Sequence, residues 1–127
     1  MTSEEFEKRR VLCEEYVKSS VSNTYEDFSN LSELWSRVGY FYALLLKEKE
    51  EVEKRLKKEE AVLFVKYKES GDRVSDVLCK NLVAADSSLD SIRALETEAN
   101  YRVNVIRGYY EALVAKRQYL SRALVED

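Results

Sequence analysis

The feature that most limits the possible folds is a long, regular seam of apolar residues in the second half of the chain. From residue 78 to residue 124 the seam positions alternate between spacings of four and three, and twelve of the fourteen are apolar or aromatic. Chance seldom keeps this register over so many turns, and the alternation is the period of a helix that packs along one side. The sequence therefore predicts one long helix over residues 75–125, with Ser75 as its N-cap.

A second seam with the same period precedes it. Apolar residues from Leu31 to Val52 follow spacings of three, four, three, four and seven, which predicts a helix over residues 24–69. We expect Gly71 to end this helix in the left-handed conformation and to begin the turn into the next one. Because the connection is short, the two long helices are expected to lie antiparallel as a coiled-coil-like hairpin.

A short helix is predicted at the N-terminus, over residues 2–19. Thr2 and Glu5 have the spacing of a capping box, and apolar residues follow at helical intervals. Residues 19–24 are rich in serine, asparagine and threonine, whose side chains compete with the helix for backbone hydrogen bonds. A break is therefore expected there.

The composition agrees with few, long elements. The chain of 127 residues has no proline and three glycines, whereas folds that contain sheets use both residues in their many turns. The sequence predicts a single all-α domain over residues 1–127: the hairpin, the short N-terminal helix, and assembly into a homo-oligomer. Gly108 is expected to lie within the last helix and to admit a close neighbour.

Assembly is expected because two helices enclose too little interior of their own. Copies of the chain would then cover each other's seams, with closed symmetry as the usual result. The alternative is a three-helix monomer in which residues 2–19 cover the exposed stripe. The side chains predicted to form the oligomer interface are Leu31, Leu34, Val38, Phe41, Leu45, Ile92, Val103, Ile106, Leu113 and Leu120.

Several classes of function are disfavoured by what the chain lacks. It has no histidine, the usual general base and the commonest metal ligand, so we expect no enzyme, no metal site and no cofactor. There is no unbroken apolar run long enough to span a membrane, and the charged start is unlike a signal peptide, so a cytoplasmic protein is expected, in the host cytoplasm if a phage encodes it. Cys13 and Cys79 are expected to be small buried hydrophobes rather than a disulfide.

The charge distribution suggests a binding surface despite the net charge of −3. Residues 101–125 hold five bases and one acid, with tyrosines between the bases. Single-stranded nucleic acid is bound by this combination, since cations meet phosphates and aromatic faces meet bases. The alternative is that the bases favour the helix dipole and the tyrosines pack at contacts. The candidate nucleic-acid-binding residues here are Arg102, Arg107, Tyr109, Lys116, Arg117 and Arg122.

Three segments also resemble a known family. They are YKESGD at 67–72, RVSDVLCKNLVAADSSLDSI at 73–92, and NYRVNVIRGYYEALVAKRQYL at 100–120. In this order the chain resembles phage recombination mediators of the UvsY type over residues 31–124. The resemblance implies a ring-like homo-oligomer that binds single-stranded DNA and contacts a recombinase and a single-strand-binding protein. That family carries a basic pair just before the turn, and Leu63 and Val65 align with it here. Lys66 and Lys68 are the nearest bases and are therefore two further candidate nucleic-acid-binding residues.

The leading hypothesis is a recombination mediator that loads a recombinase onto single-stranded DNA in competition with single-strand-binding protein. The main alternative is a helical scaffold or assembly adaptor that binds only protein. A phage inhibitor of a host defence enzyme is a third hypothesis.

Overall fold

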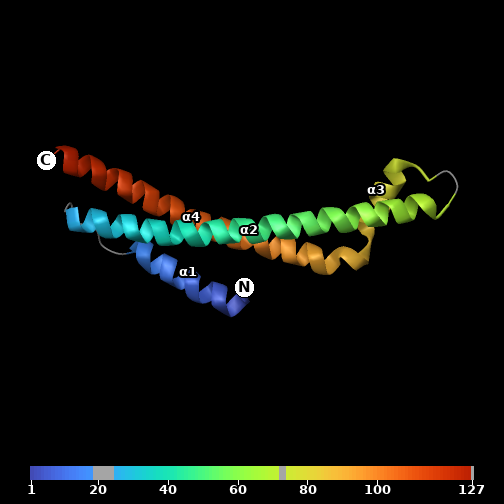
Figure 1. Cartoon of the computed structure of the whole chain (residues 1–127), viewed down its shortest axis with the longest axis horizontal. Helices are drawn as coiled ribbons and strands as arrows, with labels where there is room; N and C mark the ends of the chain where they lie inside the picture. Colours follow the sequence, from blue (N-terminus) through green and yellow to red (C-terminus); the bar gives the residue numbers. More distant parts are fainter. Residues whose placement is uncertain (19–24, 72–73, 127) are drawn as a thin grey trace. The chain divides into compact units, whose positions relative to one another are not determined.

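The structure is a computed structural model that describes residues 1–18, 25–71 and 74–126. Within these ranges the chain forms four α-helices and one short 3₁₀-helix, and no strand (Figure 1). The prediction of an all-α protein is confirmed for this part of the chain. The helices are α1 (Ser3–Lys18), α2 (Tyr25–Glu69), α3 (Asp76–Ala85), the 3₁₀-helix η1 (Ser87–Leu89) and α4 (Asp90–Glu126).

The chain divides into two compact units. Unit 1 consists of Met1–Leu46 with Tyr101–Asp127, and unit 2 consists of Lys47–Asn100. The sequence predicts a single domain over residues 1–127, and each unit is described by itself below.

Helix α1 begins with the predicted capping box. The backbone N–H of Glu5 donates to the Thr2 hydroxyl at 3.1 Å, and the backbone N–H of Thr2 donates to the Glu5 carboxylate at 3.2 Å. Two of the unpaired donors at the start of the helix are thereby satisfied. The break predicted at residues 19–24 lies outside the described residues.

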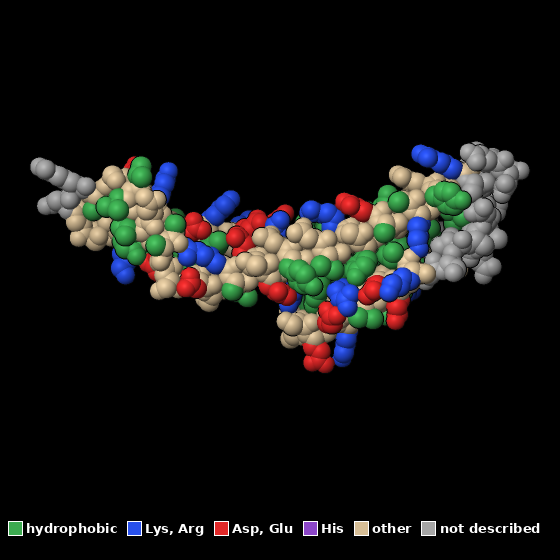
Figure 2. Space-filling model, turned by 180° about the vertical axis from the view of Figure 1, so that it is seen from behind, with side chains coloured by type: hydrophobic (Ala, Val, Ile, Leu, Met, Phe, Trp, Pro, Cys, Tyr) green, Lys and Arg blue, Asp and Glu red, His purple; other side chains and the backbone are tan. Residues whose placement is uncertain are grey.

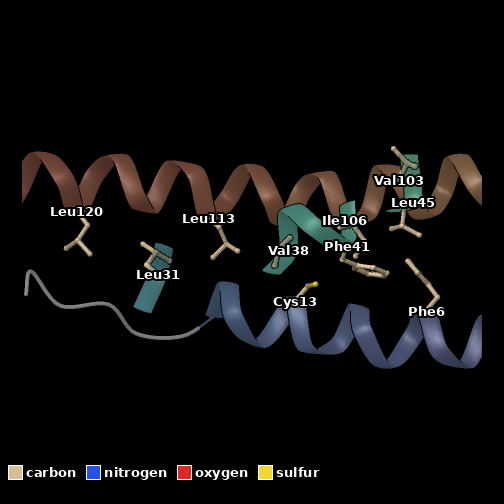
Figure 3. Packing of buried hydrophobic residues seen from close by; sticks show 10 residues of the cluster. All are labelled: Phe6, Cys13, Leu31, Val38, Phe41, Leu45, Val103, Ile106, Leu113 and Leu120. Carbon is tan, nitrogen blue, oxygen red and sulfur yellow. The ribbon is translucent and has the colours of Figure 1, made fainter. Parts of the chain in front are cut away.

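Unit 1 contains a core to which three helices contribute. In Figure 3, Leu31 of α2 lies between Leu120 and Leu113 of α4, and Phe41 lies next to Ile106. Helix α1 covers the remaining side. The complete cluster, with every member at most 5% exposed, is Phe6, Cys13, Leu31, Val38, Phe41, Leu45, Val103, Ile106, Leu113 and Leu120.

Unit 2 has a smaller core. Leu56 of α2 packs there with Val83, Leu89 and Ile92, all at most 7% exposed. Half-buried Leu63, Phe64 and Tyr67 pack against this cluster from the last turns of α2.

The end of α2 differs from the prediction. The φ angle of Gly71 lies outside the left-handed region, so the expected glycine cap is wrong. Ser70 ends the helix instead, because its backbone N–H and its hydroxyl both donate to the carbonyl of Tyr67, at 3.3 and 2.7 Å. Lys68 then reaches over the turn and donates to the carbonyl oxygen of Val74 at 2.7 Å.

The single helix predicted over residues 75–125 is interrupted at Asp86. Ser75 is the predicted N-cap, accepting from the backbone N–H of Leu78 at 3.1 Å, but α3 ends at Ala85. The Asp86 carboxylate accepts from the backbone N–H of Ser88 at 2.8 Å and also from the Tyr67 hydroxyl. Asp86 therefore ends one helix and caps the next.

A second interaction stabilises this break. The Arg93 guanidinium donates to the carbonyls of Val83 and Asp86, at 2.8 and 3.2 Å. Both carbonyls also accept from the backbone, Val83 from the N–H of Asp86 at 3.2 Å and Asp86 from the N–H of Leu89 at 3.4 Å. Arg93 thus adds a second donor to carbonyls at the end of α3, where the regular helical bonding pattern stops.

The interruption changes which residues of α3 face the core. The predicted seam begins with Leu78 and Leu82, but these are 48% and 37% exposed, whereas Cys79 and Val83 are 0% and 6% exposed. The prediction is wrong for those two leucines, because the seam phase is not carried unchanged through the 3₁₀-helix. From Leu89 to Leu120 every predicted seam position is buried or half-buried.

The glycines and cysteines have different environments from one another. Gly108 is predicted to admit a close neighbour, but a Cβ atom added there would meet nothing within 4 Å, whereas one added at Gly39 would lie 3.2 Å from the Tyr110 ring. The close approach therefore occurs at Gly39.

Both cysteines are buried free thiols, as predicted, and burial raises the pKa of the Cys13 thiol to about 11.

The Asp86 cap gives a testable pH dependence. Hydrogen bonds from Ser88 and then Tyr67 lower the pKa of Asp86 from 3.8 to about 2. A depressed pKa stabilises the fold above the unfolded value, and this effect is lost as the pH falls toward the folded value. Thermal melts should show that Asp86→Asn, which keeps the polar cap, is less stable than wild type near pH 5 or so. The gap should close between pH 3.8 and about 2; a gap of constant size would contradict this assignment.

Candidate functional site

The three residues that share one stripe of α4 at intervals of seven all face α1. Arg102 Nη1 donates to the carbonyl of Met1 at 3.0 Å, the Tyr109 hydroxyl accepts from Arg10 at 3.2 Å, and Lys116 Nζ donates to the carbonyl of Val17. The stripe therefore contacts α1 at its start, its middle and its end. The structure brings these candidates together, but inside unit 1.

Arg102 is the most deeply placed of them. This residue is 8% exposed, and its guanidinium carbon lies 5.2 Å from the centroid of the Phe6 ring. A cation over an aromatic face is stabilised by the ring quadrupole, more strongly when water is excluded. Arg102 thus fixes the N-terminal turn of α1 rather than presenting a charge to solvent.

Tyr109 belongs to a polar chain on the surface of unit 1. Its partner Arg10 also binds Glu7 at 2.5 Å and Glu14 at 3.0 Å. The hydrogen bond to Glu7, followed by that to Tyr109, raises the pKa of Arg10. The guanidinium is therefore surrounded by acceptors on its own helix and linked to α4 by a single hydroxyl.

Two further candidates face α2. Arg107 Nε donates to the Tyr42 hydroxyl at 3.0 Å, a contact that raises the pKa of Arg107. Arg117 Nε donates to the Ser32 hydroxyl at 3.3 Å, and its guanidinium carbon lies 5.0 Å from the Trp35 ring centroid. Both side chains are half-buried. They hold α4 against α2 within unit 1.

The remaining candidates are spread over the two units. Lys68, in unit 2, binds Asp76 at 2.8 Å as well as the Val74 carbonyl, so it stabilises the turn after α2. Lys66 in unit 2 and Arg122 in unit 1 are exposed. Five of the eight candidates are therefore half-buried or buried in contacts with α1 or α2: Arg102, Arg107, Tyr109, Lys116 and Arg117.

Aromatic residues of unit 1 form an internal stack. Tyr110 lies between Trp35 and Tyr42, with ring centroids 6.0 and 5.5 Å away and small interplanar angles. Gly39 makes room for the Tyr110 ring on α2. Of the tyrosines expected to meet bases, Tyr110 is thus used in packing, whereas Tyr101 and Tyr119 are 52% and 70% exposed.

The residues predicted to form an oligomer interface are mostly in contact with the same chain. Leu34 is half-buried. The other nine are at most 5% exposed within one chain: Leu31, Val38, Phe41, Leu45, Ile92, Val103, Ile106, Leu113 and Leu120. A second copy would have to contact other side chains or displace α1.

Large apolar side chains do remain exposed elsewhere in the described residues. In unit 2 they are Val62, Val65, Val77, Leu78, Leu82 and Leu95, each at least 37% exposed. Figure 2 shows hydrophobic side chains at the surface of this unit and also beside α1. The exposed apolar surface of α3 could not be predicted from the sequence. Leu78 and Leu82 have the spacing of the seam and were therefore expected on its buried face.

A groove in unit 1, between α1 and α2, was also not predicted from the sequence. Its lining includes Arg9 and Leu12 from α1 and Arg37 and Tyr40 from α2. Each helix contributes one arginine and one tyrosine to it, Tyr16 being the tyrosine of α1. These residues lie off the apolar seams. The one sequence signal for the groove is that both helices carry an arginine and a tyrosine beside an apolar position.

Comparison with known proteins finds no matching protein-family model, no matching curated protein and no matching solved structure. Among the described helices, none combines the length and the apolar character needed to cross a membrane. No three histidine, cysteine, aspartate or glutamate side chains converge in the ranges the structure covers.

The contacts of Arg102 predict a large effect on stability. Arg102→Ala removes a charged hydrogen bond to the Met1 carbonyl and the contact with Phe6, so the free energy of unfolding should fall by about 2 kcal/mol. Arg122→Ala, on the same helix but exposed, is the matched control and should change it by less than about 0.5 kcal/mol. Urea unfolding followed by circular dichroism measures both. Equal effects of the two substitutions would show that the α1 contact contributes nothing.

Proposed function

We propose that this chain is a non-catalytic helical scaffold that binds protein, including further copies of itself. The observation that carries the proposal is the orientation of the α4 stripe. Arg102, Tyr109 and Lys116, the combination that a nucleic-acid interface would need, contact α1 of the same chain. The absence of histidine from the sequence supports a function other than catalysis.

Self-association is the part of the proposal supported by exposed apolar surface. Leu78 and Leu82 of α3 lie one helical turn apart and are both exposed in unit 2. Contiguous apolar surface on a soluble protein commonly marks an interaction site. In this proposal the long helices form an antiparallel hairpin, and copies join through unit 2 in a closed homo-oligomer, so that the internal seams stay intact.

A recombination mediator is the second candidate. It is favoured by the linear arrangement of Arg102, Tyr109 and Lys116 beneath α1, since release of α1 would expose two cations and a tyrosine in one row. The exposed Lys66 and Arg122 would add phosphate contacts. In this candidate the oligomer is a ring that binds single-stranded DNA and contacts a recombinase and the single-strand-binding protein it displaces.

Binding of single-stranded DNA separates the two candidates. With its stripe covered, the intact protein should not bind fluorescein-labelled oligothymidine at concentrations up to about 50 µM in low salt, because the clustered cations of the stripe cannot reach phosphates and release counterions. Fluorescence anisotropy is the measurement. Saturable binding that weakens as salt is added, and that is lost in Lys116→Glu, would favour the mediator over the scaffold.

The same preparations also test self-association. Light scattering after size exclusion should give a mass of several chains at micromolar concentration. Leu78→Lys with Leu82→Lys should reduce that mass, because burying either ammonium at an interface is costly. Asn81→Lys with Ala84→Lys places the same charges at other exposed positions of α3 and should leave it unchanged. A wild-type monomer would contradict the scaffold proposal.

A further inference from the structure

The groove between α1 and α2 has an apolar floor and encloses about 270 Å³. Its floor is formed by Cys13, Val38 and Phe41, each at most 5% exposed, and Figure 3 shows Cys13 of α1 close to Val38 and Phe41 of α2. Its walls are more open, since Leu12 and Tyr40 are 47% and 69% exposed. Pockets for drug-sized ligands enclose about 300–1,000 Å³, so this one suits a side chain or two.

The two ends of the groove carry positive charge. The guanidinium carbon of Arg9 lies 5.2 Å from the centroid of the Phe41 ring. Arg37 precedes Phe41 by one helical turn and is hydrogen-bonded to Tyr16, a contact that, with the charge of Glu33, raises the pKa of Arg37. The guanidiniums therefore flank the apolar floor, with Arg9 at the Phe41 end and Arg37 at the Tyr16 end.

The two arginines differ in how far their charges are already compensated. Arg37 pairs with Glu33 at 2.5 Å, but both side chains are largely exposed, at 59% and 61%. Exposed pairs one turn apart on a helix contribute little, so a partner carboxylate can replace Glu33 at small cost. Arg9 contacts the Phe41 ring, and within the described residues it forms no ion pair with a carboxylate.

We propose that this groove binds a helical segment of a partner protein that presents one large apolar side chain flanked by carboxylates about one turn before and after it. The inference rests on the protein-binding function proposed above and names one partner class for it. The apolar side chain packs on Val38 and Phe41, and the carboxylates pair with Arg9 and Arg37. Arginine and tyrosine are enriched among the residues that dominate binding energy at protein interfaces.

A nucleic acid is a poorer occupant for the same groove. Residues 1–18 carry five glutamates against four bases, so a polyanion that followed α1 would meet like charge. The buried floor of Cys13, Val38 and Phe41 also offers nothing to a phosphate. A partner helix avoids both problems, because it places two carboxylates and one apolar group at defined positions.

The test uses the full chain, labelled with nitrogen-15, and a designed peptide as the probe. The peptide is alanine-based and about 20 residues long, since shorter ones are marginal helices. It carries a central leucine with a glutamate one turn to either side. We expect its addition to shift the amide NMR signals of residues 9–16 and 37–41, while signals of unit 2 stay in place.

Variants of both molecules make the test specific. Arg9→Gln and Arg37→Gln should each weaken binding by about tenfold or more. Lys8→Gln is the matched control on α1, because Lys8 is exposed and pairs with Glu4 outside the groove lining, and it should leave binding unchanged. Peptides with lysine in place of the glutamates, or alanine in place of the leucine, should not bind. Circular dichroism of each variant checks that the helices remain folded.

Three results would overturn the proposal. They are no shift at about 1 mM peptide, equal binding of the lysine peptide, and displacement of the glutamate peptide by oligothymidine. The scaffold function fails separately, by the wild-type monomer in light scattering. If the protein self-associates but does not bind the peptide, the groove inference alone is contradicted. If it is a monomer that binds the peptide, self-association is contradicted and the groove inference stands.

Discussion

Two helices that pack side by side leave part of their shared apolar seam in water, and in unit 1 that part is covered by α1. Phe6 and Cys13 enter the core with Val38 and Phe41, and the cluster becomes nearly inaccessible to solvent. At about 25 cal/mol for each Å² of apolar surface removed from water, burial of this kind is the main stabilising contribution available to so small a unit. The structure of unit 1 depends on that third helix.

The covering helix explains what the basic residues of α4 do. Helix α1 buries few apolar side chains of its own, so polar contacts at both of its ends add to its attachment: Arg102 binds the Met1 carbonyl, and Lys116 binds the carbonyl of Val17 near the C-terminus. A cation at a helix C-terminus satisfies unpaired carbonyls and complements the dipole. A charge pattern that suggests a phosphate-binding surface is thus also what an internal helix attachment requires. In the functions that we propose, binding at the surface involves other residues, namely the exposed leucines of α3 and the arginines beside α1.

The sequence predicts the helices and most of the core, because heptad periodicity is a direct consequence of packing along one face. The predicted seam positions from Leu89 to Leu120 and from Leu31 to Leu45 are all buried or half-buried. The break at Asp86 was not predicted because only part of its cause is local: the Asp86 carboxylate caps the N–H of Ser88, but Tyr67 and Arg93 add hydrogen bonds that the seam period does not reveal. The contacts of the candidate site could not be predicted for a related reason. A base that flanks a seam faces either solvent or a third helix, and the period of seven shared by Arg102, Tyr109 and Lys116 is the same in both cases.

The thiol of Cys13 measures the docking of α1 most directly. In Cys79→Ala, Cys13 is the single cysteine, and its alkylation rate near pH 8 or so can be compared between native buffer and urea. The pKa of about 11 in the folded chain lowers the fraction of reactive thiolate, so native alkylation should be slower by about a hundredfold or more. Arg102→Ala in the same background should speed it up. A native rate equal to the rate in urea would mean that α1 does not cover the core, and would contradict the account.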